Sequence, residues 1–481
     1  MKGFGFGIGF LKRFFLTEHM VKENMRRGEI PSSREAYGKS LGIAIPAITE
    51  MVSLALMGMI DTVMVGRLDE EGIAISAVGI TNQPRMLFFS LFFALNIAVT
   101  AIVARNKGAG NMGAARNCLR HALSWEIFIG LILTIFAITL ANPLMRLAGA
   151  NYATIDPAAS YFRITSYALL IQIVTGTICA AQRATGNTKI TMKVNVAAKV
   201  ISVILNFFLI EGRLFFPRME VDGAAWSTVI AAFVAFILAL ISVLHKDSDL
   251  RISFKDDWRF DKTMSKTLGG LTSGGLVEQV GLRFGFFAYA RIVAELGPSD
   301  FAAHLIAMQL MVLSFTFADG IGAAVTSLVG QNLGKERPDL SIMYGKIGAR
   351  LALICAAILS ALCILFRYQF PVIFNRNPEI IATTAGLILI LAIIMPIQTT
   401  QLVMGGSLRG AGDTKYVALT MILSVGILRP LAGFIFAFPL GFGVVGAWIA
   451  IIFDQIARLA MLASRFMGGK WINSKIDTRK T

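Results

Sequence analysis

An apolar stretch near the start of the chain, residues 41–66, constrains the fold more than any other feature. It has the roughly 20 to 25 predominantly apolar residues that a helix needs to cross a bilayer, yet it contains Pro46, Glu50 and Asp61. Glu50 and Asp61 are about three helical turns apart, so a helix would direct both carboxylates to nearly the same side. Because an ionised carboxylate facing lipid is costly, this face is expected to look into a protein interior or an aqueous cavity.

The composition is that of an integral membrane protein. Of the 481 residues, 56% are hydrophobic and 15% are charged, and the mean hydropathy is +0.68. The net charge of +16 would suit nucleic-acid binding, but most basic residues fall in the polar segments between apolar spans, as membrane topology requires. Nucleic acid is therefore not expected as a partner. No metal site and no cofactor are predicted, because the cysteines and histidines lack metal-ligand spacing.

Twelve apolar segments follow one another along the chain. They lie at about 41–65, 79–103, 121–141, 161–181, 194–210, 224–244, 269–296, 302–329, 347–366, 381–406, 417–439 and 444–466. The bias of Lys and Arg towards one set of loops predicts that both termini are cytoplasmic. We expect a multi-pass protein of the cell membrane, in our interpretation the plasma membrane of a prokaryote. The predicted cytoplasmic tails are residues 1–39 and 467–481. For the first tail, an amphipathic interfacial helix and a disordered segment fit equally well.

The chain repeats itself across its longest polar connection, residues 246–267. The loop Arg183–Lys189 (RATGNTK) recurs as Arg409–Lys415 (RGAGDTK) at the equivalent place of the second half. These repeats predict two six-helix lobes, residues 40–245 and 268–466, joined by a cytoplasmic linker. Because six is even, the lobes share one membrane orientation as parallel repeats. We assign the repeated loop to tight helix connections and lipid headgroup contact rather than to substrate binding.

Several motifs occur here in a characteristic order. They are Pro46, the run Asp61-Thr-Val-Met-Val-Gly66, LVGQNLG at 328–334, the paired RxxG(N/D)TK loops and Gly-Ala-Ala-Trp at 223–226. Together they resemble the multidrug and toxic compound extrusion (MATE) family over about residues 40–466, and most of all its DNA-damage-inducible and archaeal branch. The resemblance implies an all-α membrane protein with twelve transmembrane helices in two pseudo-symmetric six-helix bundles.

The same resemblance implies a function. It points to a secondary active multidrug exporter that antiports cationic or amphipathic organic compounds against H⁺, or less favourably Na⁺, by alternating access. The expected partners are small-molecule drugs and membrane lipids, and the expected state is a monomer. A lipid or lipid-linked oligosaccharide flippase of the same superfamily is the alternative. An enzyme is not expected, because neither a phosphate-binding GxxxxGK[ST] motif nor a catalytic constellation is found.

The motif of Asp61 matches that of the family's ion-coupling aspartate, so the resemblance implies that Asp61 takes part in ion coupling. The resemblance adds Ser202, Asn206 and Thr228 as hydrogen-bonding neighbours but brings no second carboxylate. A hard cation such as Na⁺ prefers several charged oxygens, so this departure favours proton coupling.

Four further residues are candidates for the substrate cleft. Glu50 and Glu278 occupy similar places in the two halves and either attract cationic substrates or anchor the ends of their helices. Asp319, beside two glycines, fits a packing hinge as well as a binding role. Arg283 is expected to pair with a carboxylate, for which Glu278 is near in sequence.

Overall fold

The computed structural model describes residues 14–66, 68, 73–212, 217–245, 248–253, 258 and 261–473. All regular structure in this part of the chain is helical. Parts of the predicted linker at 246–267 and the outer ends of both predicted tails lie outside the described residues.

Long helices account for every predicted span. Ten helices of the described residues are long and apolar enough to cross a membrane, and α6 with α7 forms an eleventh span that bends by 50°. The remaining span is α10, which is equally long but more polar. The helices are α2 (Ser33–Gly66), α3 (Ile73–Gly108), α4 (Met112–Thr139), α5 (Ala141–Leu147), α6 (Ile155–Tyr167), α7 (Leu169–Ala184), α8 (Thr188–Leu209), α9 (Glu220–Leu244), α10 (Lys262–Ala294), α11 (Pro298–Gly334), α12 (Pro338–Leu365), α13 (Gln369–Phe374), α14 (Pro378–Gly410), α15 (Thr414–Met421), α16 (Arg429–Ala437) and α17 (Gly443–Met467).

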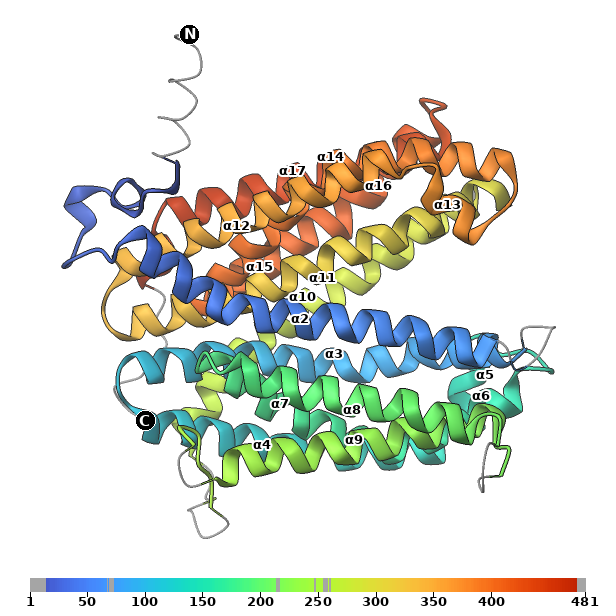
Figure 1. Cartoon of the computed structure of the whole chain (residues 1–481), viewed down its shortest axis with the longest axis horizontal. Helices are drawn as coiled ribbons and strands as arrows, with labels where there is room; N and C mark the ends of the chain where they lie inside the picture. Colours follow the sequence, from blue (N-terminus) through green and yellow to red (C-terminus); the bar gives the residue numbers. More distant parts are fainter. Residues whose placement is uncertain are drawn as a thin grey trace. The chain divides into compact units, whose positions relative to one another are not determined.

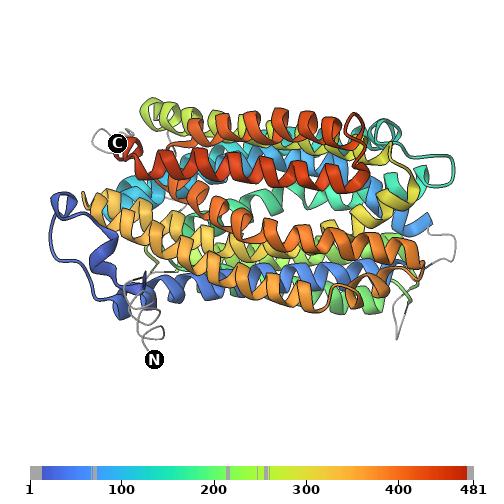
Figure 2. The same ribbon diagram turned by 90° about the horizontal axis from the view of Figure 1, so that it is seen from above.

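The described residues form two compact units. The N-terminal unit contains the described residues of Thr49–Val103 and Asn111–Leu276. The C-terminal unit contains the described residues up to Ile48, the segment Ala104–Gly110 and the described residues from Val277 onward. Within the N-terminal unit α8 packs on α9 and α4 packs on α7 (Figure 1). Within the C-terminal unit α14 packs against α11, α12 and α17 and is its central helix (Figures 1 and 2).

The eleventh predicted span is interrupted by a π-helical segment, η3 (Ile422–Leu428), between α15 and α16. Pro430 is the second residue after it and has no backbone N–H to donate to the preceding turn. The wider π turn lets the helix continue past this missing hydrogen bond, as bulges of this kind commonly do in membrane helices.

The repeated RxxG(N/D)TK motif forms the same turn in both halves. Gly186 and Gly412 have φ angles of 84° and 85°, in the left-handed region where a side chain is strained. In each turn the glycine N–H bonds the carbonyl of the motif's arginine at 2.9 Å. The next residue but one then begins a new helix, α8 or α15, so the motif makes the tight helix connection predicted from the sequence.

Replacing Gly412 by alanine is expected to destabilise the protein by about 1–2 kcal/mol, the usual cost of a left-handed conformation for a residue with a Cβ. Gly386 of α14 is the matched control, because a Cβ added there meets no atom within 4 Å and its φ is helical. Thermal unfolding in detergent measures both. Equal melting temperatures for the two variants would contradict the assigned role of the turn.

The chain before α2 packs on α12 and on α11. Its described residues form two short 3₁₀ turns, η1 (Thr17–Met20) and η2 (Glu23–Met25). The first 13 residues of the predicted tail lie outside the described residues, so the choice between an amphipathic helix and a disordered segment stays open there. Met20 and Val21 are buried in a cluster with Leu328, Met343 and Ile347. Arg337 donates a hydrogen bond to the backbone carbonyl of Glu29 at 2.9 Å. Residues 14–32 are therefore an ordered part of the C-terminal unit.

Candidate functional site

Asp61 lies on α2 with both carboxylate oxygens bonded to side chains of α8. Lys199 donates from Nζ to Oδ2, and Asn206 donates from Nδ2 to Oδ1 at 2.8 Å. Asn206 in turn accepts a hydrogen bond at Oδ1 from the hydroxyl of Ser227 on α9. The side chains of Asp61 and Lys199 are 22% and 27% exposed, so the pair is partly shielded. We call these four residues the Asp61 group.

The spacing along α8 explains how two of these residues reach one carboxylate. Lys199 and Asn206 are seven residues apart, which is about two turns and places both side chains on the same face. Of the three neighbours carried over from the family, only Asn206 contacts Asp61. Thr228 donates back to the carbonyl of Ala224 at 3.0 Å, and the buried Ser202 hydroxyl has no hydrogen-bond partner among the described residues. Sequence reasoning did not connect Lys199 or Ser227 to Asp61.

Glu50 and Glu278 are each buried in an ion pair with the arginine of a repeated loop. Glu50 accepts from Arg183 at 3.1 Å, and Glu278 accepts from Arg409 at 2.6 Å. Asn195 also donates to Glu50, at 2.7 Å. Each charge is thus neutralised by an ion pair inside its own unit. The partner of Glu278 is thus Arg409 and not the nearby Arg283 that the sequence suggested.

The other two cleft candidates lie on different helices of the C-terminal unit. Asp319 is an exposed residue of α11, on which the charge of Arg409 acts. Its neighbour Gly320 lets α11 approach α2, because a Cβ there would come within 2.8 Å of the Ile48 backbone. Arg283 is an exposed residue of α10. Among the described residues, Asp319 and Arg283 form no ion pair with each other.

Two completely buried acids inside predicted apolar spans were not among the candidate site residues. Asp454 on α17 accepts hydrogen bonds from Arg429 at 2.5 Å and from Arg458 at 2.6 Å. Glu126 on α4 has no such arginine and is bonded only to Thr177 among the described residues. An acid in an apolar span was the available signal for both residues.

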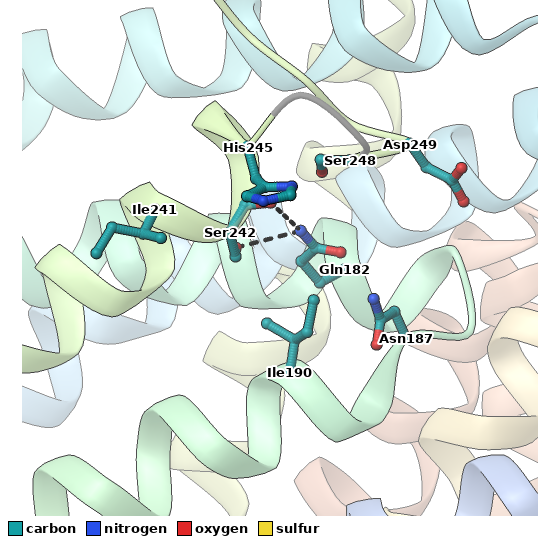
Figure 3. Close-up of a pocket in the computed structure, with 8 residues that line it drawn as sticks. All are labelled: Gln182, Asn187, Ile190, Ile241, Ser242, His245, Ser248 and Asp249. Atoms are coloured by element: carbon teal, nitrogen blue, oxygen red, sulfur yellow. Dashed lines mark hydrogen bonds between the residues drawn. The ribbon is translucent and has the colours of Figure 1, made fainter.

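A polar pocket of about 400 Å³ opens where α7 and α9 end and α8 begins in the N-terminal unit (Figure 3). Gln182 crosses it and donates to the backbone and hydroxyl oxygens of Ser242 at 3.4 and 3.2 Å. Its lining shares no residue with the Asp61 group and consists of Gln182, Asn187, Ile190, Ile241, Ser242, His245, Ser248 and Asp249. In the second half Asp413 takes the place of Asn187 and binds Arg465 at 2.7 Å.

Comparison with known proteins agrees with this architecture. The MatE family model matches residues 46–208 and 276–444. The probable multidrug resistance protein NorM of Thermotoga maritima is 28% identical over 96% of this chain and 98% of its own length. Multidrug resistance protein PmpM of Pseudomonas aeruginosa is 26% identical over 80% of each chain.

A solved MOP superfamily transporter from Pyrococcus furiosus superimposes with a TM-score of 0.83 at 18% identity, over 92% of this chain and 97% of that chain. This likeness confirms the predicted fold class, an all-α membrane protein of twelve helices in two six-helix bundles. The two segments matched by the family model together cover more than half of the sequence. The chain therefore belongs to the multidrug and toxic compound extrusion family of transporters.

Proposed function

We propose that this protein is a secondary active exporter that exchanges cationic or amphipathic organic compounds for protons by alternating access. Membership of a transporter family supports transport, and the names of the relatives from Thermotoga maritima and Pseudomonas aeruginosa support multidrug export. The observation on which the coupling proposal depends is the Asp61 group, in which a single carboxylate of a membrane helix is bound by a lysine and an amide.

The composition of the Asp61 group favours the proton over Na⁺ as the coupling ion. A sodium site needs several oxygen ligands, preferably with negative charge. Here the ammonium group of Lys199 already occupies the place next to Oδ2, and Asn206 presents its N–H to Oδ1. A second cation at Asp61 would be repelled by Lys199, whereas a proton adds to the carboxylate itself.

Protonation of Asp61 would alter the contact between α2 and α8. A neutral carboxyl attracts the Lys199 ammonium much less than a carboxylate does, since the ion pair is lost. Lys199 is then free to turn towards water, and α2 loses one of its two side-chain bonds to α8. In an antiport cycle this change is made by the incoming proton and reversed when the proton leaves on the other side of the membrane.

Transport by reconstituted protein tests the proposal. Proteoliposomes are loaded with a fluorescent cation, such as ethidium, and its efflux is followed under a proton gradient alone and under a sodium gradient alone. We expect the proton gradient to drive efflux and the sodium gradient to have no effect. Efflux driven only by sodium would reject proton coupling, and efflux driven by neither gradient would reject secondary active transport of this cation.

A further inference from the structure

Glu126 differs from the other buried acids because no cationic side chain among the described residues pairs with it. It lies in the middle of α4 and is completely buried. Its Oε1 atom is bonded to the Thr177 hydroxyl, and its Oε2 atom has no hydrogen-bond partner among the described residues. Burying an ionised carboxylate without a counter-charge is very costly in a low-dielectric interior. This environment therefore favours a neutral, protonated Glu126.

The hydrogen bonds around Thr177, with the Asn96 amide oriented as in this structure, call for the same proton. Thr177 Oγ1 lies against two oxygens, Oε1 of Glu126 and Oδ1 of Asn96, the latter at 2.5 Å. A threonine hydroxyl has one hydrogen, and a carbonyl oxygen has none. With Asn96 Oδ1 facing Thr177, as in this structure, Thr177 can donate to only one of the two oxygens, so the second hydrogen comes from the carboxyl group. Glu126 then donates to Thr177, and Thr177 donates to Asn96.

Asn96 connects this chain of side chains to a cavity. It lines a cavity of about 260 Å³ between α3 and α7, together with Asn82, Arg85, Met86, Phe89, Phe92, Phe93, Gln172, Ile173 and Gly176. A Cβ added at Gly176 would lie 3.5 Å from Asn96 Nδ2. The amide nitrogen of Asn96 therefore faces Gly176, which is itself a lining residue of the cavity. Arg85 is the charged side chain in this lining among the described residues.

We propose that Glu126 is a second proton-binding carboxyl of the N-terminal unit, and that Thr177 and Asn96 link its protonation to the cavity. The inference rests on the proposed proton coupling and adds a site to it. When Glu126 loses its proton to water, Thr177 turns its hydrogen to the carboxylate. Asn96 then turns its amide to donate an N–H to Thr177. Each hydrogen bond is kept with its direction reversed, and one proton has left.

This reversal changes what the cavity presents to a ligand. With Glu126 protonated, Asn96 offers its N–H₂ group to the cavity. With Glu126 ionised, it offers its carbonyl oxygen instead. A ligand that donates a hydrogen bond to Asn96, such as an amine, therefore favours proton release from Glu126. The arrangement couples ligand binding to proton loss within one unit, as an antiporter requires.

Proton release on ligand binding tests the inference. Purified protein in weakly buffered detergent is mixed with ethidium, and a pH indicator reports the protons released. We expect the Glu126→Gln variant to release about one proton fewer per bound ethidium, because glutamine keeps the hydrogen bonds but has no proton to lose. Thr177→Val should lose the same proton while keeping the infrared band of a protonated carboxylic acid. Thr139→Val, which removes an exposed hydroxyl of α4, should behave like the wild type.

Two results would overturn the inference. One is a folded Glu126→Gln variant that releases as many protons as the wild type, and the other is an infrared carboxylic acid band that this substitution leaves unchanged. Should Glu126→Gln fail to fold, undiminished proton release by Thr177→Val rejects the inference. If Asp61→Asn is the only substitution that diminishes proton release, the inference about Glu126 is rejected and the proposed proton coupling is not. If the wild-type protein releases no protons, both the inference about Glu126 and the proposed proton coupling are rejected.

Discussion

Replacement of Asp61 by asparagine is expected to abolish proton-driven export and to leave the protein folded in the membrane. Asparagine has the same shape and keeps an oxygen that Asn206 can bond, so the contact of α2 with α8 is preserved in part. It cannot take up and release a proton, and it cannot form an ion pair with Lys199. The measurement is ethidium efflux from proteoliposomes under an imposed proton gradient.

A second carboxylate-to-amide exchange in the same unit provides the control. Glu220 forms an exposed ion pair with Arg218, with side chains 60% and 61% exposed, and takes no part in the Asp61 group. Glu220→Gln is expected to export ethidium at the wild-type rate, since exposed pairs contribute little to stability. Wild-type export by a folded Asp61→Asn variant would show that the coupling proton binds elsewhere.

The number and order of the membrane helices could be predicted from the sequence because the bilayer imposes them. A chain segment in hydrocarbon must satisfy its own backbone hydrogen bonds, so each apolar segment of about 20 residues becomes a helix. The helix ends were harder to predict. α2 begins at Ser33, well before the apolar stretch at 41–66, because hydropathy marks where a helix meets lipid and not where its hydrogen bonds start. The bend between α6 and α7 lies inside one apolar segment, 161–181, and has no hydropathy signal.

For the candidate site, the sequence predicts which residues share a face of one helix but not which helices contact each other. Helical spacing indicates which residues share a face, and the family motif singled out Asp61 and Asn206. Spacing cannot indicate which helices pack together, so the pairing of Asp61 with Lys199 was not anticipated. The same limit applies to Glu50 and Arg183, which are far apart in sequence. The repeat contained a usable signal, since both acids and both arginines recur at equivalent places of the two halves.

Replacement of Asp454 by asparagine is expected to lower the free energy of unfolding strongly. Asp454, Arg429 and Arg458 are at most 2% exposed, and the one carboxylate binds both guanidinium groups. Without it two positive charges remain buried next to each other. Breaking a buried ion pair by removing one partner typically costs about 3–5 kcal/mol. Denaturant titration of the detergent-solubilised protein measures the loss.

A charge removal at an exposed pair separates this effect from loss of charge in general. Glu295 pairs with Arg291 one turn away on the same unit, and both side chains are more than half exposed. Pairs of this kind contribute about 0.3–0.5 kcal/mol, so Glu295→Gln should be nearly neutral. If Asp454→Asn is equally mild, the two arginines must find other compensation once the carboxylate is gone.

The origin of the loss can be tested by removing the arginines as well. A protein with Asp454→Leu, Arg429→Met and Arg458→Met has no buried charge at this place and keeps similar side-chain volume. Apolar replacement of a whole buried ionic group is often neutral or stabilising, because the cost of desolvating the charges disappears with them. We therefore expect the triple variant to be more stable than Asp454→Asn, although it has lost two more polar side chains. A triple variant as unstable as the single one would mean that Asp454 acts through its shape and hydrogen bonds rather than through its charge.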